Sequence, residues 1–205
     1  MKKITYHQNS IEVQTLIKQD PKLKQLFDLK SEVIVEIDDQ YFVSLVGTII
    51  AQQLSSKVAR VLFNRLDAHC NHLITPEKIR DMLPETMRSM GLSYQKQSYL
   101  KSLAECMLNQ TVNFEHIHQM TNQEVIDMLT SIKGIGVWSA EMFLMFSLGR
   151  EDVFSVGDLG LRNALKKLYG MPELTHKEIL KISESWQPYR SIVSHYLWHA
   201  WDSLS

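Results

Sequence analysis

The stretch Ser131–Ala140 (SIKGIGVWSA) constrains the fold more than any other part of the chain. Its two glycines, Gly134 and Gly136, stand between an amphipathic helical pattern and a nearly continuous apolar one. Glycine allows the main chain to turn sharply and to approach a ligand closely. The N–H groups at the start of the second helix can then bind an anion such as a DNA phosphate. The stretch therefore predicts a tight hairpin between two helices, and these residues alone leave open whether it is an ordinary turn or an outward-facing anion site.

A second informative stretch, Asp152–Leu165 (DVFSVGDLGLRNAL), places the carboxylate of Asp158 at the start of another helix. An Asp before an apolar helix is most often an N-cap residue. A lone carboxylate near a phosphate-binding turn also suits chemistry on a nucleic-acid strand. These residues alone leave both interpretations open.

The rest of the pattern is helical. From Tyr41 onward, apolar residues recur at helical spacing and predict an all-α protein of about ten helices. Thr75-Pro76 and Leu83-Pro84 each mark a helix start. Val137–Leu148 is nearly all apolar and predicts a central buried helix. The β-branched stretch Glu32–Ile37 (EVIVEI) is the best strand candidate.

Composition narrows the classes of protein that remain. A net charge of −1 gives no global support for nucleic-acid binding, so DNA contacts must come from a local patch and from main-chain amides. Two cysteines, Cys70 and Cys106, are too few for a disulfide framework or a four-cysteine iron–sulfur cluster, and we expect both to be buried thiols. No apolar run is long enough for a signal peptide or a membrane span.

Four motifs in order along the chain resemble those of the helix-hairpin-helix DNA glycosylases, the HhH-GPD superfamily. The resemblance runs from about Tyr41 to Trp201 and is greatest to the 3-methyladenine DNA glycosylase II (AlkA-like) branch, without the extra N-terminal β domain of that branch. The matching motifs are Ile49–Ser55 (IIAQQLS), the hairpin Ile132–Ala140, the D-V-F-x-x-x-D segment that ends at Asp158, and Trp186–Ser191 (WQPYRS) followed by Tyr196–Trp198.

The resemblance implies a fold and an organisation. The chain, 1–205, is expected to form one all-α glycosylase unit of two helical lobes, with the active-site cleft between them and at most one short extended N-terminal segment. Lobe A would span about 41–150, including the hairpin 131–140. Lobe B would combine about 1–40 with 151–205.

The resemblance also implies the catalytic chemistry. Asp158 falls at the position of the family's catalytic aspartate, where it would stabilise the oxocarbenium-like charge on the deoxyribose and orient or deprotonate water. Bifunctional members place a nucleophilic Lys where this chain has Trp138. The chain is therefore expected to be monofunctional, to use water and to leave an abasic site.

Further site residues follow from the same resemblance. Trp138 and Trp198 are expected to line the pocket for the flipped base, with Gln52 and Met142 beside them. Gln53 is the expected intercalating wedge, although the best-known relatives use Leu there, and a plain surface Gln is the alternative. The expected phosphate-binding residues of the hairpin are Gly134, Ile135, Gly136, Val137 and Ser139. A monovalent cation, Na⁺ or K⁺, would bind the main-chain carbonyls of Thr130, Ile132 and Gly134.

The function expected from this resemblance is base excision repair of double-stranded DNA. The expected substrates are 3-methyladenine and 7-methylguanine, with ethenoadenine and hypoxanthine as further candidates, and no cofactor is required. Two alternatives remain open, a glycosylase for another damaged or mismatched base and a non-catalytic damage-binding module. We expect a monomer that binds no membrane, in the cytoplasm with the nucleoid if bacterial and in the nucleus if eukaryotic.

Overall fold

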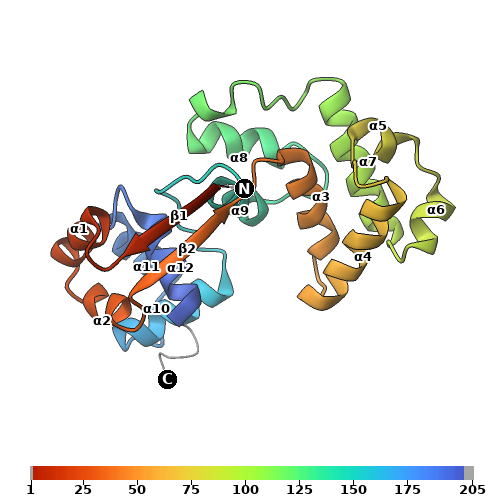
Figure 1. Cartoon of the computed structure of the whole chain (residues 1–205). Helices are drawn as coiled ribbons and strands as arrows, with labels where there is room; N and C mark the ends of the chain where they lie inside the picture. The colour runs from red at the N-terminus through yellow and green to blue at the C-terminus, as the bar shows by residue number, and fades with distance from the viewer. Residues whose placement is uncertain (1, 201–205) are drawn as a thin grey trace. The chain divides into compact units, whose positions relative to one another are not determined.

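The computed structural model describes residues 2–200, and Trp201 lies outside them. This part of the chain forms twelve α-helices, one 3-10 helix and two β-strands, so the predicted, mainly helical fold is confirmed (Figure 1). The chain divides into two compact units. Unit 1 consists of Met1–Asp38 and Leu144–Ser205, and unit 2 of Asp39–Phe143.

Unit 1 contains a small sheet that the sequence analysis only half predicted. Strand β2 (Glu32–Ile37) lies where it was expected, but β1 (Lys2–His7) pairs with it in antiparallel register from Lys2↔Ile37 to His7↔Glu32. The expectation of at most one extended segment is therefore wrong. Tyr6 is the only buried residue of β1, so the strand lacks the alternation of buried and exposed residues that would identify it from sequence. Its hydrogen-bonded pairing with β2 is what makes this segment a strand.

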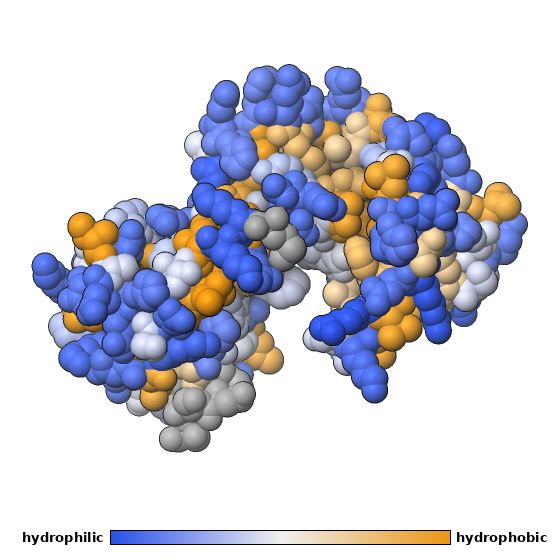
Figure 2. Space-filling model, viewed as in Figure 1, coloured by the Kyte–Doolittle hydropathy of each residue, from blue (hydrophilic) through white to orange (hydrophobic). Residues whose placement is uncertain are grey.

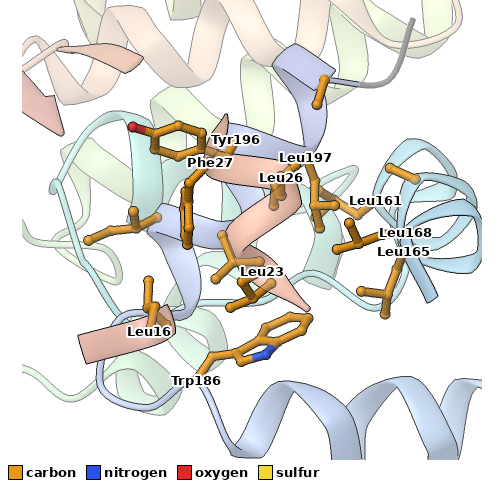
Figure 3. Packing of buried hydrophobic residues seen from close by; sticks show 14 of the residues in the cluster. Leu16, Leu23, Leu26, Phe27, Leu161, Leu165, Leu168, Trp186, Tyr196 and Leu197 are labelled. Carbon is orange, nitrogen blue, oxygen red and sulfur yellow. The ribbon is translucent and has the colours of Figure 1, made fainter. Parts of the chain in front are cut away.

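Five helices complete unit 1, and its core joins the two ends of the chain. They are α1 (Ile11–Gln19), α2 (Leu23–Asp28), α10 (Leu159–Tyr169), α11 (His176–Glu184) and α12 (Arg190–Ala200). Figure 3 shows residues of α1 and α2, such as Leu16, Leu23 and Phe27, among residues of the C-terminal helices. The Phe27 and Tyr196 rings meet edge to face at 4.7 Å. Burial of these apolar side chains holds the N-terminal segment against α10 and α12.

Unit 2 is built from a continuous run of helices. They are α3 (Tyr41–Ala51), α4 (Ser56–His69), α5 (Pro76–Asp81), α6 (Pro84–Ser89), α7 (Tyr94–Leu108), the 3-10 turn Ile117–Gln119, α8 (Asn122–Thr130) and α9 (Val137–Phe146), whose last residues belong to unit 1. Pro76 and Pro84 open their helices as predicted. The helix predicted over Val137–Leu148 ends slightly earlier, at Phe146.

The surface is ordinary for a folded protein. Hydrophilic residues cover most of the face in Figure 2, with hydrophobic residues in small separate patches. Cys70 is buried as expected, whereas Cys106 is only half-buried, which corrects the expectation for that thiol. Among residues 2–200, no helix has the length and apolar character needed to cross a bilayer.

We predict that Asp20→Ala destabilises unit 1. The Asp20 carboxylate accepts a hydrogen bond from the indole N–H of Trp186 (3.0 Å), a core residue that is fully buried. Without this acceptor a buried donor is left unsatisfied, which costs about 2 kcal/mol. Urea unfolding measures the loss. Asp28→Ala removes only an exposed pair with Lys24 and should change stability by less than about 0.5 kcal/mol. Equal losses in the two variants would contradict the prediction.

Candidate active site

In the hairpin of unit 2, the main chain at Gly134 packs closely against the ring of Tyr99. Gly134 has φ +90°, and a Cβ placed on it would lie 2.2 Å from Cγ of Tyr99, a residue of α7. The Ile135 N–H donates to the Ile132 carbonyl (3.1 Å), which closes the turn. A Cβ on Gly136 would meet nothing within 4 Å. A glycine is therefore required on steric grounds only at Gly134, although the sequence suggested a need for glycine at both positions.

Helix α9 begins directly after this turn. Gly136, Val137 and Trp138 are exposed, with 54% of Val137 and 45% of Trp138 accessible. The Ala140 N–H donates to the Gly136 carbonyl (3.1 Å) as the first turn forms. The side chain of Ser139 is buried, so only its main chain is suited to an external ligand. The exposed start of a ten-residue helix carries the positive end of its macrodipole.

The loop after α3 reaches the same hairpin. The side-chain amide of Gln52 donates to the Gly134 carbonyl (2.8 Å). Gln53 follows with an exposed side chain and a left-handed φ of +59°. Two features predicted from separate motifs, the loop and the hairpin, are thus joined by a hydrogen bond within unit 2. Met142 is half-buried one helical turn after Trp138.

Asp158 lies in unit 1 as the N-cap of α10. Its Oδ1 accepts the Leu161 N–H (2.8 Å) and the indole N–H of Trp198 from α12 (3.2 Å). Gly160 gives this pair room, because a Cβ there would lie 3.2 Å from Asp158 Oδ1 and 3.8 Å from the Trp198 ring. One carboxylate therefore starts α10 and orients the indole of α12.

The segment that leads into Asp158 is anchored at its other end. The Arg190 guanidinium makes a bidentate pair with the Asp152 carboxylate (2.7 and 3.0 Å). The Ser191 hydroxyl donates to the Arg150 carbonyl (2.7 Å) and accepts the Val153 N–H (2.9 Å). Arg190 and Ser191 belong to α12, so the helix that carries Trp198 also fixes the approach to Asp158.

Trp198 lies in an aromatic cluster of unit 1. Its ring is 5.6 Å from Phe146 and 5.8 Å from His195. These three residues, with β2 residues and His199, line a pocket of about 360 Å³. Burial lowers the pKa of His195 to about 4, with a smaller contribution from His199, so its imidazole is neutral at pH 7.

Two of the carbonyl oxygens predicted to bind a cation, those of Ile132 and Gly134, each have a lone pair left for it. The Ile132 and Gly134 carbonyls each accept one hydrogen bond, from Ile135 and Gln52, and a carbonyl oxygen has two lone pairs. Within residues 2–200, no three His, Cys, Asp or Glu side chains gather as a metal site would require. The monovalent cation stays a prediction.

The predicted residues therefore lie in two groups. Asp158 and Trp198 belong to unit 1, while the hairpin, Gln52, Gln53, Trp138 and Met142 belong to unit 2. Sequence reasoning missed Tyr99 as the ring beneath Gly134, and Phe146 and His195 as neighbours of Trp198. Tyr99 and His195 carry no local signal, since each lies in an ordinary helical pattern. The apolar run of α9 did include Phe146.

Residues 46–188 match the model of the HhH-GPD superfamily of base excision DNA repair proteins. The chain belongs to this superfamily. The match covers the α3 loop, the hairpin and the Asp158 segment, and it ends before Trp198.

Relatives of known name support the assignment. The chain is 42% identical over 158 residues to DNA-3-methyladenine glycosylase 1 of Schizosaccharomyces pombe, covering 75% of this chain and 69% of that protein. A crystal structure of DNA-3-methyladenine glycosidase from Bacillus halodurans superposes with a TM-score of 0.90 at 37% identity, covering 97% and 92% of the two chains. A Schizosaccharomyces pombe 3-methyladenine DNA glycosylase in complex with abasic DNA superposes with a TM-score of 0.80 at 34% identity, covering 93% and 96%.

We predict that Gly134→Ala destabilises the hairpin and that Gly136→Ala does not. The first methyl group would enter the Tyr99 ring and impose a left-handed φ on Ala, at a cost of about 2 kcal/mol or more. The second meets open space and should change the free energy of unfolding by less than about 1 kcal/mol. Denaturant unfolding of both variants measures the difference. Equal stability of the two would disprove the role assigned to Tyr99.

We predict a stability loss in mild acid that depends on His195. Above pH 6.5 the imidazole is neutral in the folded and unfolded states, so it has no effect. Between pH 6.5 and about 4 the unfolded state binds a proton that the folded state does not, and stability falls by about 3 kcal/mol. Unfolding curves between pH 7 and pH 4 measure this loss. His195→Leu should flatten the dependence, and an unchanged slope would refute it.

Proposed function

We propose that this chain is a monofunctional DNA glycosylase of base excision repair. It hydrolyses the N-glycosidic bond of alkylated purines in duplex DNA and leaves an abasic site. The observation that carries the proposal is Asp158, held at the start of α10 with its carboxylate bonded to Trp198. The names of the relatives, DNA-3-methyladenine glycosylases from yeasts and bacteria, support the same substrate class.

Asp158 provides the negative charge for the reaction. Two N–H donors at the positive end of the α10 macrodipole hold this carboxylate in place. As the glycosidic bond breaks, positive charge develops on the deoxyribose, and a fixed carboxylate stabilises it without reorganisation. The same carboxylate orients the attacking water and accepts its proton.

The aromatic residues select the leaving base. A purine alkylated on a ring nitrogen is cationic, and an indole face attracts a cation by roughly 0.5–2 kcal/mol. Trp198 of unit 1 and Trp138 of unit 2 each provide such a face. His195 is neutral at pH 7 and adds no opposing charge next to Trp198. The cationic base leaves readily, so the site needs no dedicated general acid.

The nucleophile is water. Trp138 occupies the position at which bifunctional members carry a Lys, so no amine is available there to form a Schiff base. Lys133, five residues earlier, is exposed and donates to the Ser98 hydroxyl (2.9 Å). The product is therefore an abasic site with an intact strand.

Unit 2 binds and distorts the DNA. The main chain of Gly134, Ile135, Gly136, Val137 and Ser139 holds a phosphate, and this contact is independent of base sequence. A monovalent cation on the carbonyls of Thr130, Ile132 and Gly134 would add a charge between hairpin and phosphate. The exposed Gln53 enters the gap that the flipped nucleotide leaves.

We predict that Asp158→Asn abolishes base release and preserves the fold. Asn caps helices about as well as Asp, and its amide oxygen can accept both hydrogen bonds, so only the charge is lost. Excision should fall by about 100-fold or more, while the free energy of unfolding changes by less than about 1 kcal/mol. Chromatography of bases released from methylated duplex DNA measures the first, and urea unfolding the second.

Asp28→Asn on α2 is the matched control, because it removes an exposed carboxylate that pairs only with Lys24. It should release 3-methyladenine and 7-methylguanine at the wild-type rate. Full activity of Asp158→Asn would reject the catalytic assignment. Wild-type protein that releases no methylated purine would reject the substrate class.

A further inference from the structure

Lys96 of α7 occupies an unusual place at the end of α3. Its ammonium group donates to three main-chain carbonyls, those of Ile49 (3.1 Å), Ile50 (2.7 Å) and Gln52 (2.7 Å). An ammonium has three donors, so these acceptors use all of them. The last carbonyls of a helix lack main-chain partners, and a cation there also matches the negative end of the macrodipole.

No carboxylate takes part in this arrangement. Among residues 2–200, no acidic side chain lies within ion-pair distance of Lys96, and burial lowers the pKa of its ammonium group. The charge is balanced by carbonyl dipoles alone. The ammonium group of Lys96 therefore acts on main-chain carbonyls, two in the last turns of α3 and one, that of Gln52, in the loop that follows.

The loop that Lys96 holds is the one that presents Gln53. The Leu54 N–H donates to the Ala51 carbonyl (3.1 Å), and the Gln52 amide donates to the Gly134 carbonyl (2.8 Å). Gln53, between them, has φ +59°, which a residue other than glycine keeps only when its surroundings impose it. The loop is therefore tied on one side to α7 and on the other to the hairpin.

The loop also has space in which to relax. Lys96, Gln53 and Tyr99 line a polar pocket of about 230 Å³ together with Gln52, Ser93, Gln95 and Gly134. If the three bonds from Lys96 are removed, the loop can move into this space and Gln53 can leave its left-handed conformation.

We propose that Lys96 is a positioning residue for base flipping, which holds the loop Gln52–Leu54 so that Gln53 projects outward and enters the DNA stack. This inference rests on the proposed function. An inserted side chain compensates for the pairing and stacking lost when a base is extruded. Lys96 therefore matters most when the damaged base is paired, and least when it has no partner.

The experiment compares two duplexes that carry one 7-methylguanine, opposite either cytosine or an abasic-site analogue. Single-turnover excision is measured for wild type, Lys96→Met and Lys101→Met. Lys101 is a matched control, since it also lies on α7 and donates to two carbonyls, those of Arg80 and Met82, at the end of α5 (2.7 Å each). Lys96→Met should lose about tenfold or more on the paired lesion and less than about threefold on the unpaired one. Lys101→Met should stay within about threefold on both, and Lys96→Arg should recover most of the paired-lesion rate.

Equal losses of Lys96→Met on the two duplexes, or no loss on either, would overturn the proposal. Inactive wild-type protein would instead refute the proposed function. A second readout requires no activity, namely amide hydrogen exchange of Leu54, whose N–H donates to the Ala51 carbonyl; it should quicken in Lys96→Met and stay unchanged in Lys101→Met. If Lys96→Met does not fold, Lys96→Gln, which loses the charge and shortens the side chain but keeps N–H donors, should show the same pair-dependent loss. Unchanged exchange or a pair-independent loss would again overturn the proposal.

Discussion

The carboxylate of Asp158 serves two helices at once. Its Oδ1 accepts the Leu161 N–H at the start of α10 and the Trp198 indole N–H of α12. The sequence left two interpretations of Asp158 open, a helix cap and a reacting group. The structure makes the two compatible. The capping bonds hold the carboxylate in a fixed position, which is what charge stabilisation by a preorganised group requires. Gly160 leaves room for the contact between Asp158 and Trp198, and the Arg190–Asp152 ion pair anchors the segment that leads into Asp158.

Local patterns predicted most elements of the fold. Strand β2, the helix starts at Pro76 and Pro84, and the apolar helix α9 all follow from residues within a few positions of one another. Strand β1 was missed because its partner lies 25 or more residues away in the register Lys2↔Ile37 to His7↔Glu32. Because β1 has only one buried residue, its own sequence shows no alternating pattern. Only its pairing with the distant strand β2 makes it a strand.

The candidate site was predictable where a motif specifies the main chain and unpredictable where a distant side chain supports it. Asp158 and the Gly134 turn come from contiguous motifs. Tyr99 beneath Gly134 and Lys96 beneath the α3 loop come from α7, in a stretch that has only the spacing of an amphipathic helix. Both act through contacts between residues more than 30 positions apart, which no local pattern encodes.

The two-part composition of unit 1 has a consequence for synthesis on the ribosome. Unit 2 is one continuous segment, Asp39–Phe143, and it is synthesised before α10 and α12 of unit 1. The apolar faces of α1 and α2 are made before unit 2, whereas their partners in α10 and α12 are made after it. Because domains form as units while the chain emerges, the N-terminal segment must wait with Leu16, Leu23 and Phe27 uncovered. The core of unit 1 can therefore close only after unit 2 has been synthesised, and α1 and α2 need protection from aggregation until then.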